Sequence, residues 1–154
     1  EADRYRQAKQ LVDGILELQK QTRFPSVKSN GNGSAPDGAG SPACHIVLAG
    51  DFNTTDDSDA FLNLRDAGLQ SLWDYIPTQP SPLPNFTTWK YRPDADGNVT
   101  DVKRVIDYIW YSEGLTALRR WSPLSVEAIG ADGLPSWQYP SDHIALCCDL
   151  LMDE

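Results

Sequence analysis

A chain of 154 residues is long enough to bury a core, and its net charge of −9 makes it a poor non-specific ligand for a nucleic-acid backbone. The 40% hydrophobic content and five Trp exclude a disordered protein, and no apolar run is long enough to cross a membrane. The three cysteines, of which Cys147 and Cys148 are adjacent, do not make a disulfide framework, which favours an intracellular location, cytoplasmic or mitochondrial.

The chain starts with a predicted helix from Glu1 to about Gln21. Apolar residues recur through it at helical spacing, and Phe24 and Pro25 end it. Residues 26–42 are rich in Ser, Gly, Asn and Pro, and we expect them to form a flexible internal loop without a catalytic role. This loop joins a helix to a strand within one domain.

The segment His45–Asn53 follows, with the sequence H-I-V-L-A-G-D-F-N. Its short apolar run is typical of a strand buried on both faces, and Gly50 bends the chain at its end. Residues two apart on an extended chain project to the same side, so Asp51 and Asn53 are expected to share a face. A carboxylate beside an amide suits a site that handles water, metal or phosphate. The alternative is a strand followed by a capped turn, because Asp and Asn both favour turns.

Two strands are predicted in the middle of the chain, at Phe86–Tyr91 and Arg104–Ser112, after a short helix closed by Gly68. The segment 93–101 between these strands indicates a hairpin with a long tip. In the second strand, Asp107 is the one acid on a face otherwise made of Val105, Ile109 and Tyr111. A buried carboxylate is costly unless it has a partner. The sequence leaves open whether Asp107 pairs with an Arg or orients a catalytic His.

The last part of the chain is predicted to contain a weak strand (Leu118–Trp121), a helical turn (Ser125–Gly130), a loop and a final buried strand from Ile144 to Leu151. His143 would lie where that strand begins. A single His is more often structural, but this one follows Asp142 and has Asp107 as a possible partner. This placement favours a functional histidine.

Three separated motifs together resemble the C-terminal half of the endonuclease/exonuclease/phosphatase superfamily. They are G-D-F-N at 50–53, I-D-Y-I-W-Y-S at 106–112 and P-S-D-H at 140–143. F-T-T-W-K-Y-R at 86–92 and L-P-S-W-Q-Y-P-S-D-H at 134–143 look most like the nocturnin branch. The resemblance implies a DNase I-like, four-layered α/β sandwich of mainly antiparallel sheets. It further implies that residues 1–154 supply about half of one catalytic domain.

Carried over residue by residue, the resemblance implies Mg²⁺-dependent hydrolysis of a phosphate ester by water. Asp51 would position or deprotonate the water, and Asn53 would bind the water and a phosphate oxygen. His143 would hold the phosphoryl oxygen while Asp107 fixes the imidazole, and Asp142 would lie near the metal. The principal metal-binding Glu of the superfamily belongs to the N-terminal half and has no counterpart here. We therefore expect an inactive half-site that needs the N-terminal half as its partner.

The nocturnin resemblance implies a phosphatase that removes the 2′-phosphate from NADP(H) and gives NAD(H). Lys90 and Arg92 are the basic residues placed to bind further phosphates, although ordinary surface charge is the alternative. A 3′ exoribonuclease acting on poly(A) RNA is the second possibility, and a non-catalytic binding module is the third. That all four predicted catalytic residues, Asp107 included, are intact argues against the third.

Overall fold

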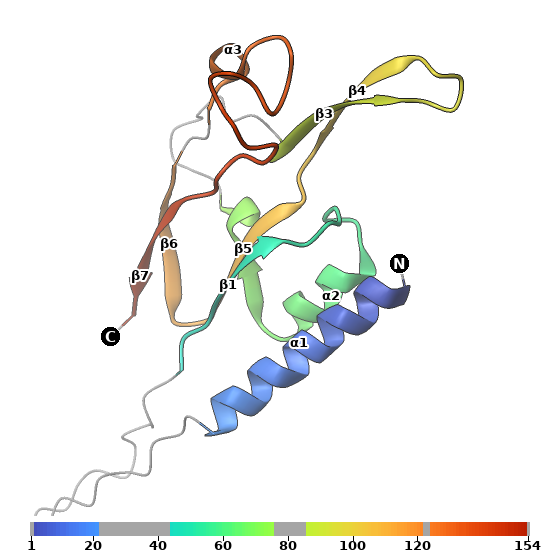
Figure 1. Cartoon of the computed structure of the whole chain (residues 1–154). Helices are drawn as coiled ribbons and strands as arrows, with labels where there is room; N and C mark the ends of the chain where they lie inside the picture. The colour runs from blue at the N-terminus through green and yellow to red at the C-terminus, as the bar shows by residue number, and fades with distance from the viewer. Residues whose placement is uncertain (1, 22–43, 76–85, 122–123, 154) are drawn as a thin grey trace, which may run out of the picture.

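The computed structural model describes residues 2–21, 44–75, 86–121 and 124–153. Every strand pairing in this part of the chain is antiparallel: a three-stranded sheet of order β1-β5-β2, and the two-stranded pairs β3-β4 and β6-β7 (Figure 1). Helices and antiparallel sheets thus combine into the predicted α/β architecture. In chain order the elements are α1 (Ala2–Gln21), β1 (Val47–Asp51), α2 (Asp59–Asp66), β2 (Leu69–Ser71), the 3-10 helix η1 (Leu72–Asp74), β3 (Thr88–Pro93), β4 (Val99–Arg104), β5 (Asp107–Ser112), β6 (Leu115–Arg120), α3 (Val126–Ile129) and β7 (Cys148–Met152).

Helices α1 and α2 pack against each other, and their apolar residues meet the three-stranded sheet. Helix α1 runs as predicted, and its Ala8 and Val12 are buried. Helix α2 begins after Ser58, whose Oγ accepts a hydrogen bond from the backbone N–H of Ala60. The chain leaves this helix through Gly68 at φ +81°, which a glycine adopts without strain. The prediction of a short helix closed by Gly68 is confirmed.

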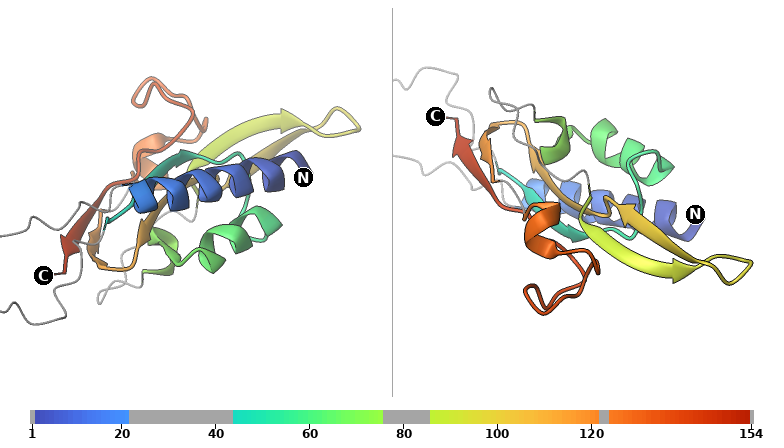
Figure 2. Two further views of the ribbon diagram at one scale, coloured as in Figure 1. Left: turned by 90° about the horizontal axis from the view of Figure 1, so that it is seen from below. Right: turned by 90° about the horizontal axis from the view of Figure 1, so that it is seen from above.

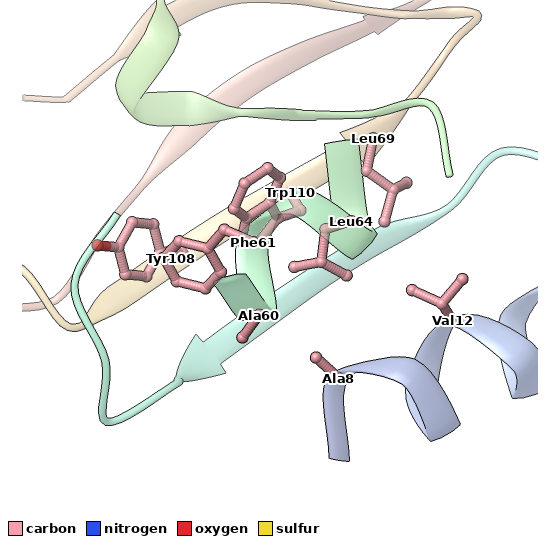
Figure 3. Close-up of a cluster of buried hydrophobic side chains, with 8 residues drawn as sticks. All are labelled: Ala8, Val12, Ala60, Phe61, Leu64, Leu69, Tyr108 and Trp110. Atoms are coloured by element: carbon pink, nitrogen blue, oxygen red, sulfur yellow. The ribbon is translucent and has the colours of Figure 1, made fainter. Parts of the chain in front are cut away.

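Strand β5 is the centre of the fold because both of its faces are covered. Tyr108 and Trp110 point into one cluster with Phe61 and Leu64, in which the Phe61 ring meets Tyr108 edge-on and Trp110 at a tilt (Figure 3). Ile109 and its neighbours on the other face enter a second cluster with Leu72, Tyr111 and Ala117. This alternation holds β5 rigidly, and Asp107 is its first residue.

The prediction that β1 is buried on both faces is wrong for this chain. Val47 is 54% exposed, while Leu48 packs partly against the cluster around Phe61. The reason is that only the face of Leu48 packs against the core, while no described element covers the face of Val47. Among the described residues β1 pairs with β5 alone, so it is also an edge strand. An apolar run cannot by itself distinguish a central strand from an edge strand.

The predicted hairpin of Phe86–Tyr91 with Arg104–Ser112 is also wrong. Strand β3 pairs with β4, whose first three residues (99–101) belong to the predicted hairpin tip at 93–101. The turn is shorter because the carboxylate of Asp94 accepts hydrogen bonds from the backbone N–H groups of Asp96 and Asn98. After β4 the chain bends and enters the other sheet as β5. Val105 therefore packs with the cluster around Phe61 and does not share the face of Asp107 and Ile109.

The final strand β7 begins at Cys148, four residues later than predicted, and it pairs with β6. The segment before it crosses to β3 instead, where His143 forms an isolated bridge with Thr88. The helical turn near residue 126 is confirmed as α3, capped by Ser125. The loop predicted at 26–42 lies outside the described residues. Within the described ranges no helix is long and apolar enough to cross a membrane, and Cys147 and Cys148 form no disulfide.

Candidate active site

Three side chains form what we call the acid–histidine cluster: Asp51, Asp107 and His143. The antiparallel register of β1 and β5 places Asp51 directly opposite Asp107, where one strand ends and the other begins. The chain then brings His143 to the same place from the loop before β7. Residues far apart in the sequence thus meet at the end of the central strand pair.

His143 lies between the two carboxylates. Its Nδ1 is 2.9 Å from Oδ2 and 3.1 Å from Oδ1 of Asp107, and its Nε2 is 3.9 Å from Oδ2 of Asp51. An ionised carboxylate only accepts hydrogen bonds, so Nδ1–H donates to Asp107 and Nε2 faces Asp51. The partner that the sequence required for Asp107 is therefore a histidine and not an arginine.

Two buried threonines hold this pair in place. Thr87 Oγ1 accepts hydrogen bonds from the backbone N–H groups of Ile106 and Asp107, at 3.0 and 3.1 Å. Thr87 O accepts the N–H of Ile144 at 2.7 Å, and Thr88 Oγ1 donates to Asp142 O at 3.0 Å. These two positioning residues were not predicted from the sequence. The signal was two consecutive hydroxyl residues between the apolar Phe86 and Trp89, where side-chain hydroxyls must find partners if buried.

Asn53 adopts a conformation that the sequence analysis did not expect. Its φ is +51°, in the left-handed region, so the chain is not extended at this residue. The backbone N–H of Asn53 donates to Oδ1 of Asp51 at 2.7 Å, which makes a tight turn. The two alternatives for this segment, a capped turn and a functional site, are therefore both realised: Asn53 forms the turn after β1 and also lines the cavity beside His143.

That cavity has a volume of about 230 Å³, and we call it the basic pocket. Arg4, Lys90, Arg92 and Arg104 line it, and no Asp or Glu is among the described residues that do so. Lys90 and Arg92 were predicted to bind substrate, whereas Arg4 and Arg104 were not. Arg4 belongs to the first turn of α1 and Arg104 ends β4, so only the tertiary fold brings them together. The other residues that line the pocket are Asn53, Thr88, Val102, Ile106 and His143.

Asp142 lies beside this pocket and is already paired. Its Oδ2 is 2.7 Å from Nζ of Lys90 and 3.9 Å from Nε2 of His143. The hydrogen bond from Lys90 holds the pKa of the Asp142 carboxyl below its usual value. A metal ion would have to compete with Lys90 for this carboxylate, and its metal-binding role stays a prediction.

The donor atoms of the acid–histidine cluster lie within 4.8 Å of one another, which is compatible with a bound cation. Asp107 and His143 satisfy each other, so Asp51 is the carboxylate left to face a metal. Mg²⁺ prefers oxygen ligands and is commonly held by one or two carboxylates with waters and substrate phosphate. Asp51, with the amide oxygen of Asn53 nearby in sequence, fits one part of such a shell.

Comparison with known proteins shows the family of the chain that carries this site. Residues 29–143 match the model of the endonuclease/exonuclease/phosphatase family. The chain belongs to this family. The family has the DNase I-like α/β fold, and its members are hydrolases that generally depend on a divalent metal. The match includes all three residues of the acid–histidine cluster.

The chain is also similar to individual members of the family. It is 31% identical to nocturnin of Rattus norvegicus over 112 residues, which cover 71% of this chain and 25% of that protein. It is 33% identical to nocturnin of Xenopus laevis over 114 residues, which cover 71% of this chain and 28% of that protein. A probable CCR4-Not complex 3′-5′-exoribonuclease subunit Ccr4 of Enterocytozoon bieneusi (strain H348) is 32% identical over 111 residues, 66% of this chain and 23% of that protein. The chain thus spans about a quarter of the length of the nocturnins that it matches.

Proposed function

We propose that this chain supplies the acid–histidine cluster of an Mg²⁺-dependent phosphoester hydrolase that removes the 2′-phosphate of NADP(H) and gives NAD(H). The observation that carries the proposal is that His143 lines the basic pocket, so the cluster adjoins a cavity whose described lining includes four basic residues and no acid. Of these four, Lys90 alone is paired to a described carboxylate, that of Asp142. A phosphate in this cavity would lie beside the imidazole. The similarity to the nocturnins supports the same assignment.

The proposed reaction is attack of water on phosphorus, with cleavage of the ester P–O bond and release of the sugar hydroxyl and phosphate. Asp51 accepts the proton of the water, and the side-chain amide of Asn53 donates to the water and to a phosphate oxygen. His143, when protonated, donates from Nε2 to a phosphoryl oxygen as charge develops. Asp107 acts through His143 by fixing the ring at Nδ1. A bound Mg²⁺, which Asp51 would help to hold, would neutralise negative charge at the phosphate.

The size of the basic pocket supports a small substrate over a polymer. A cavity of about 230 Å³ is below the range of pockets that enclose a drug-sized ligand, so it accommodates a phosphorylated part of a dinucleotide. The net charge of −9 also disfavours a long RNA track. The alternative is a 3′ exoribonuclease acting on poly(A), which the similarity to the Ccr4 subunit favours.

We further propose that residues 1–154 form the C-terminal half of one catalytic domain and that its N-terminal half is the partner. The metal ligands available in the cluster support this. Asp107 is occupied by Nδ1 of His143, so Asp51 is the remaining acid of the cluster, and a complete Mg²⁺ shell needs more ligands. The exposed apolar face of β1 around Val47 would be covered by such a partner. The half-domain on its own is expected to be inactive.

The test is phosphate release from NADPH in the presence of Mg²⁺ by the full-length protein, with shortening of a poly(A) ladder measured in parallel. His143→Ala should lower phosphate release by about 100- to 1,000-fold, because it removes a group that acts in the transition state. The matched control is His45→Ala, since the His45 ring approaches Glu113 O at 3.4 Å and lies outside the cluster. This control should keep its activity within about twofold.

The outcomes separate the three possibilities. Phosphate release that His143→Ala abolishes, with RNA intact, supports the dinucleotide phosphatase. RNA shortening without phosphate release moves the protein to the exoribonucleases. A folded protein with neither activity overturns both and leaves the binding module.

A further inference from the structure

The basic residues of this acidic chain divide into two groups. Among the cations in the described ranges, most pair with a carboxylate, as Arg6 does with Asp3 at 2.8 Å and Arg65 with Asp74 at 2.6 Å. Arg120 lies over the ring of Trp73, 4.7 Å from its centroid. Among the described side chains, no acid and no aromatic ring pairs with Arg4, Arg92 or Arg104.

These three arginines line one cavity, the basic pocket, although they come from three different elements. Arg4 is in the first turn of α1, Arg92 is in β3 and Arg104 ends β4. The N-terminal end of α1 and the β3-β4 hairpin lie on the same side of the molecule in all three views (Figures 1 and 2). The fold thus gathers its unpaired arginines at one place, while acidic side chains are plentiful elsewhere on the surface.

The charge in the pocket exceeds what one phosphate requires. Lys90 is already neutralised by Asp142 at 2.7 Å, and His143 faces the reacting phosphoryl group in the proposed function. Three further guanidinium groups near each other repel unless an anion lies between them. Each of them presents a planar set of donors that matches two phosphate oxygens. A second phosphate group on the substrate would satisfy these donors.

We propose that Arg4 and Arg104 form a subsite for a second phosphate group, and that this subsite selects substrates carrying a phosphate in addition to the one hydrolysed. In NADP(H) that group is the pyrophosphate bridge. This inference rests on the proposed function for the identity of the substrate. The subsite itself rests on the unpaired arginines and on the absence of acids among the residues that line the pocket.

Equilibrium binding without turnover tests the subsite. Adenosine 2′,5′-bisphosphate and 2′-AMP differ by one phosphate, and their dissociation constants for the full-length protein are measured by calorimetry in EDTA. The wild-type protein should bind the bisphosphate at least about tenfold more tightly, since a charge-assisted contact of this kind is worth a factor of ten or more. Arg4→Gln and Arg104→Gln should each remove most of that preference, while affinity for 2′-AMP falls less.

The matched control is Arg6→Gln, on the same helix as Arg4 but paired with Asp3 and outside the pocket. It should retain the wild-type preference, which removes net charge as an explanation. Arg4→Lys keeps the charge but not the planar donors, and its loss should be intermediate. Thermal unfolding of each variant checks that the fold is intact.

Equal losses for both ligands in Arg4→Gln, no loss for either, or no preference in the wild-type protein would overturn the subsite. Phosphate release from NADPH is then measured for the same proteins. Release that is absent while the binding pattern holds contradicts the proposed function alone. Release that is present and insensitive to Arg4→Gln contradicts the subsite alone.

Discussion

The acid–histidine cluster and the basic pocket share His143, but they are built in opposite ways. In the cluster the polar groups hold one another: Asp107 holds His143, and Thr87 holds the backbone of Asp107. In the pocket three arginines have no partner among the described side chains. Asp107 of the cluster begins β5, the strand that is buried on both faces, whereas the three arginines of the pocket are exposed residues of α1, β3 and β4.

This difference separates two tasks. A group that transfers or holds a proton must be oriented before the substrate arrives, so its partners belong to the protein. A group that binds an anion keeps its donors for the ligand, and satisfying them within the protein would weaken binding. Variants in the cluster should therefore change the rate of the chemical step, and variants in the pocket should change affinity.

Among variants that leave His143 in place, the largest effect is expected for Asp107→Asn, which keeps the size of the side chain and removes its charge. Without the carboxylate the orientation of His143 is no longer fixed, and kcat for phosphate release by the full-length protein should fall by about 10- to 100-fold with little change in KM. Steady-state kinetics measure both constants. Asp101→Asn, in β4 and paired with Lys103, is the control and should leave them unchanged. A rise in KM at constant kcat would assign Asp107 to substrate binding instead.

A smaller effect of the opposite kind is expected for Arg92→Gln. Loss of one charged donor in the basic pocket should raise KM for NADPH by about tenfold and leave kcat nearly unchanged. The control is Arg119→Gln in β6, which removes a positive charge paired with Asp149 at 3.0 Å outside the pocket. If both variants raised KM equally, general electrostatic attraction and not the pocket would explain the result.

The smallest effect is expected for Lys90→Met, because Lys90 lines the basic pocket and pairs with Asp142, which lies next to His143 of the cluster. Lys90 lowers the pKa of Asp142, so this substitution should raise that pKa towards the ordinary aspartate value of about 3.9, as NMR titration of the carboxyl carbon would show. A lowered pKa stabilises the fold above the unfolded-state pKa, and the contribution is lost as pH falls through the folded-state value. The stability change should be small, because both side chains are partly exposed. An unchanged pKa would show that Lys90 does not hold Asp142.

The sequence and the structure agree best where local chemistry decides the outcome. Helix α1, the short helix closed by Gly68 and the helical turn α3 all follow from periodicity and capping residues. The cost of an unpaired acid on an apolar strand predicted that Asp107 has a partner, and it left an Arg or a His open; only the family resemblance implied His143. Such costs are properties of residue types, so they can be read from the sequence.

Strand neighbours and surface position could not be read in this way. The apolar run of β1 suits a central strand, and only the sheet order shows that it is an edge. The hairpin of β3 with β4, and the bend that sends β5 into another sheet, depend on Thr87 accepting two backbone N–H groups from residues about twenty positions away. Pairing between distant strands is chosen by total burial and hydrogen bonding, and no local pattern encodes it.

By itself, the sequence determined the family motifs, the acids, the amide and the histidine that carry the chemistry, and the basic residues Lys90 and Arg92. Only the tertiary structure placed Arg4 and Arg104 beside them, and only the register of β1 with β5 set Asp51 opposite Asp107. The physical reason is that reactivity belongs to the residue, whereas the arrangement of charge around it comes from elements that meet only when the chain folds.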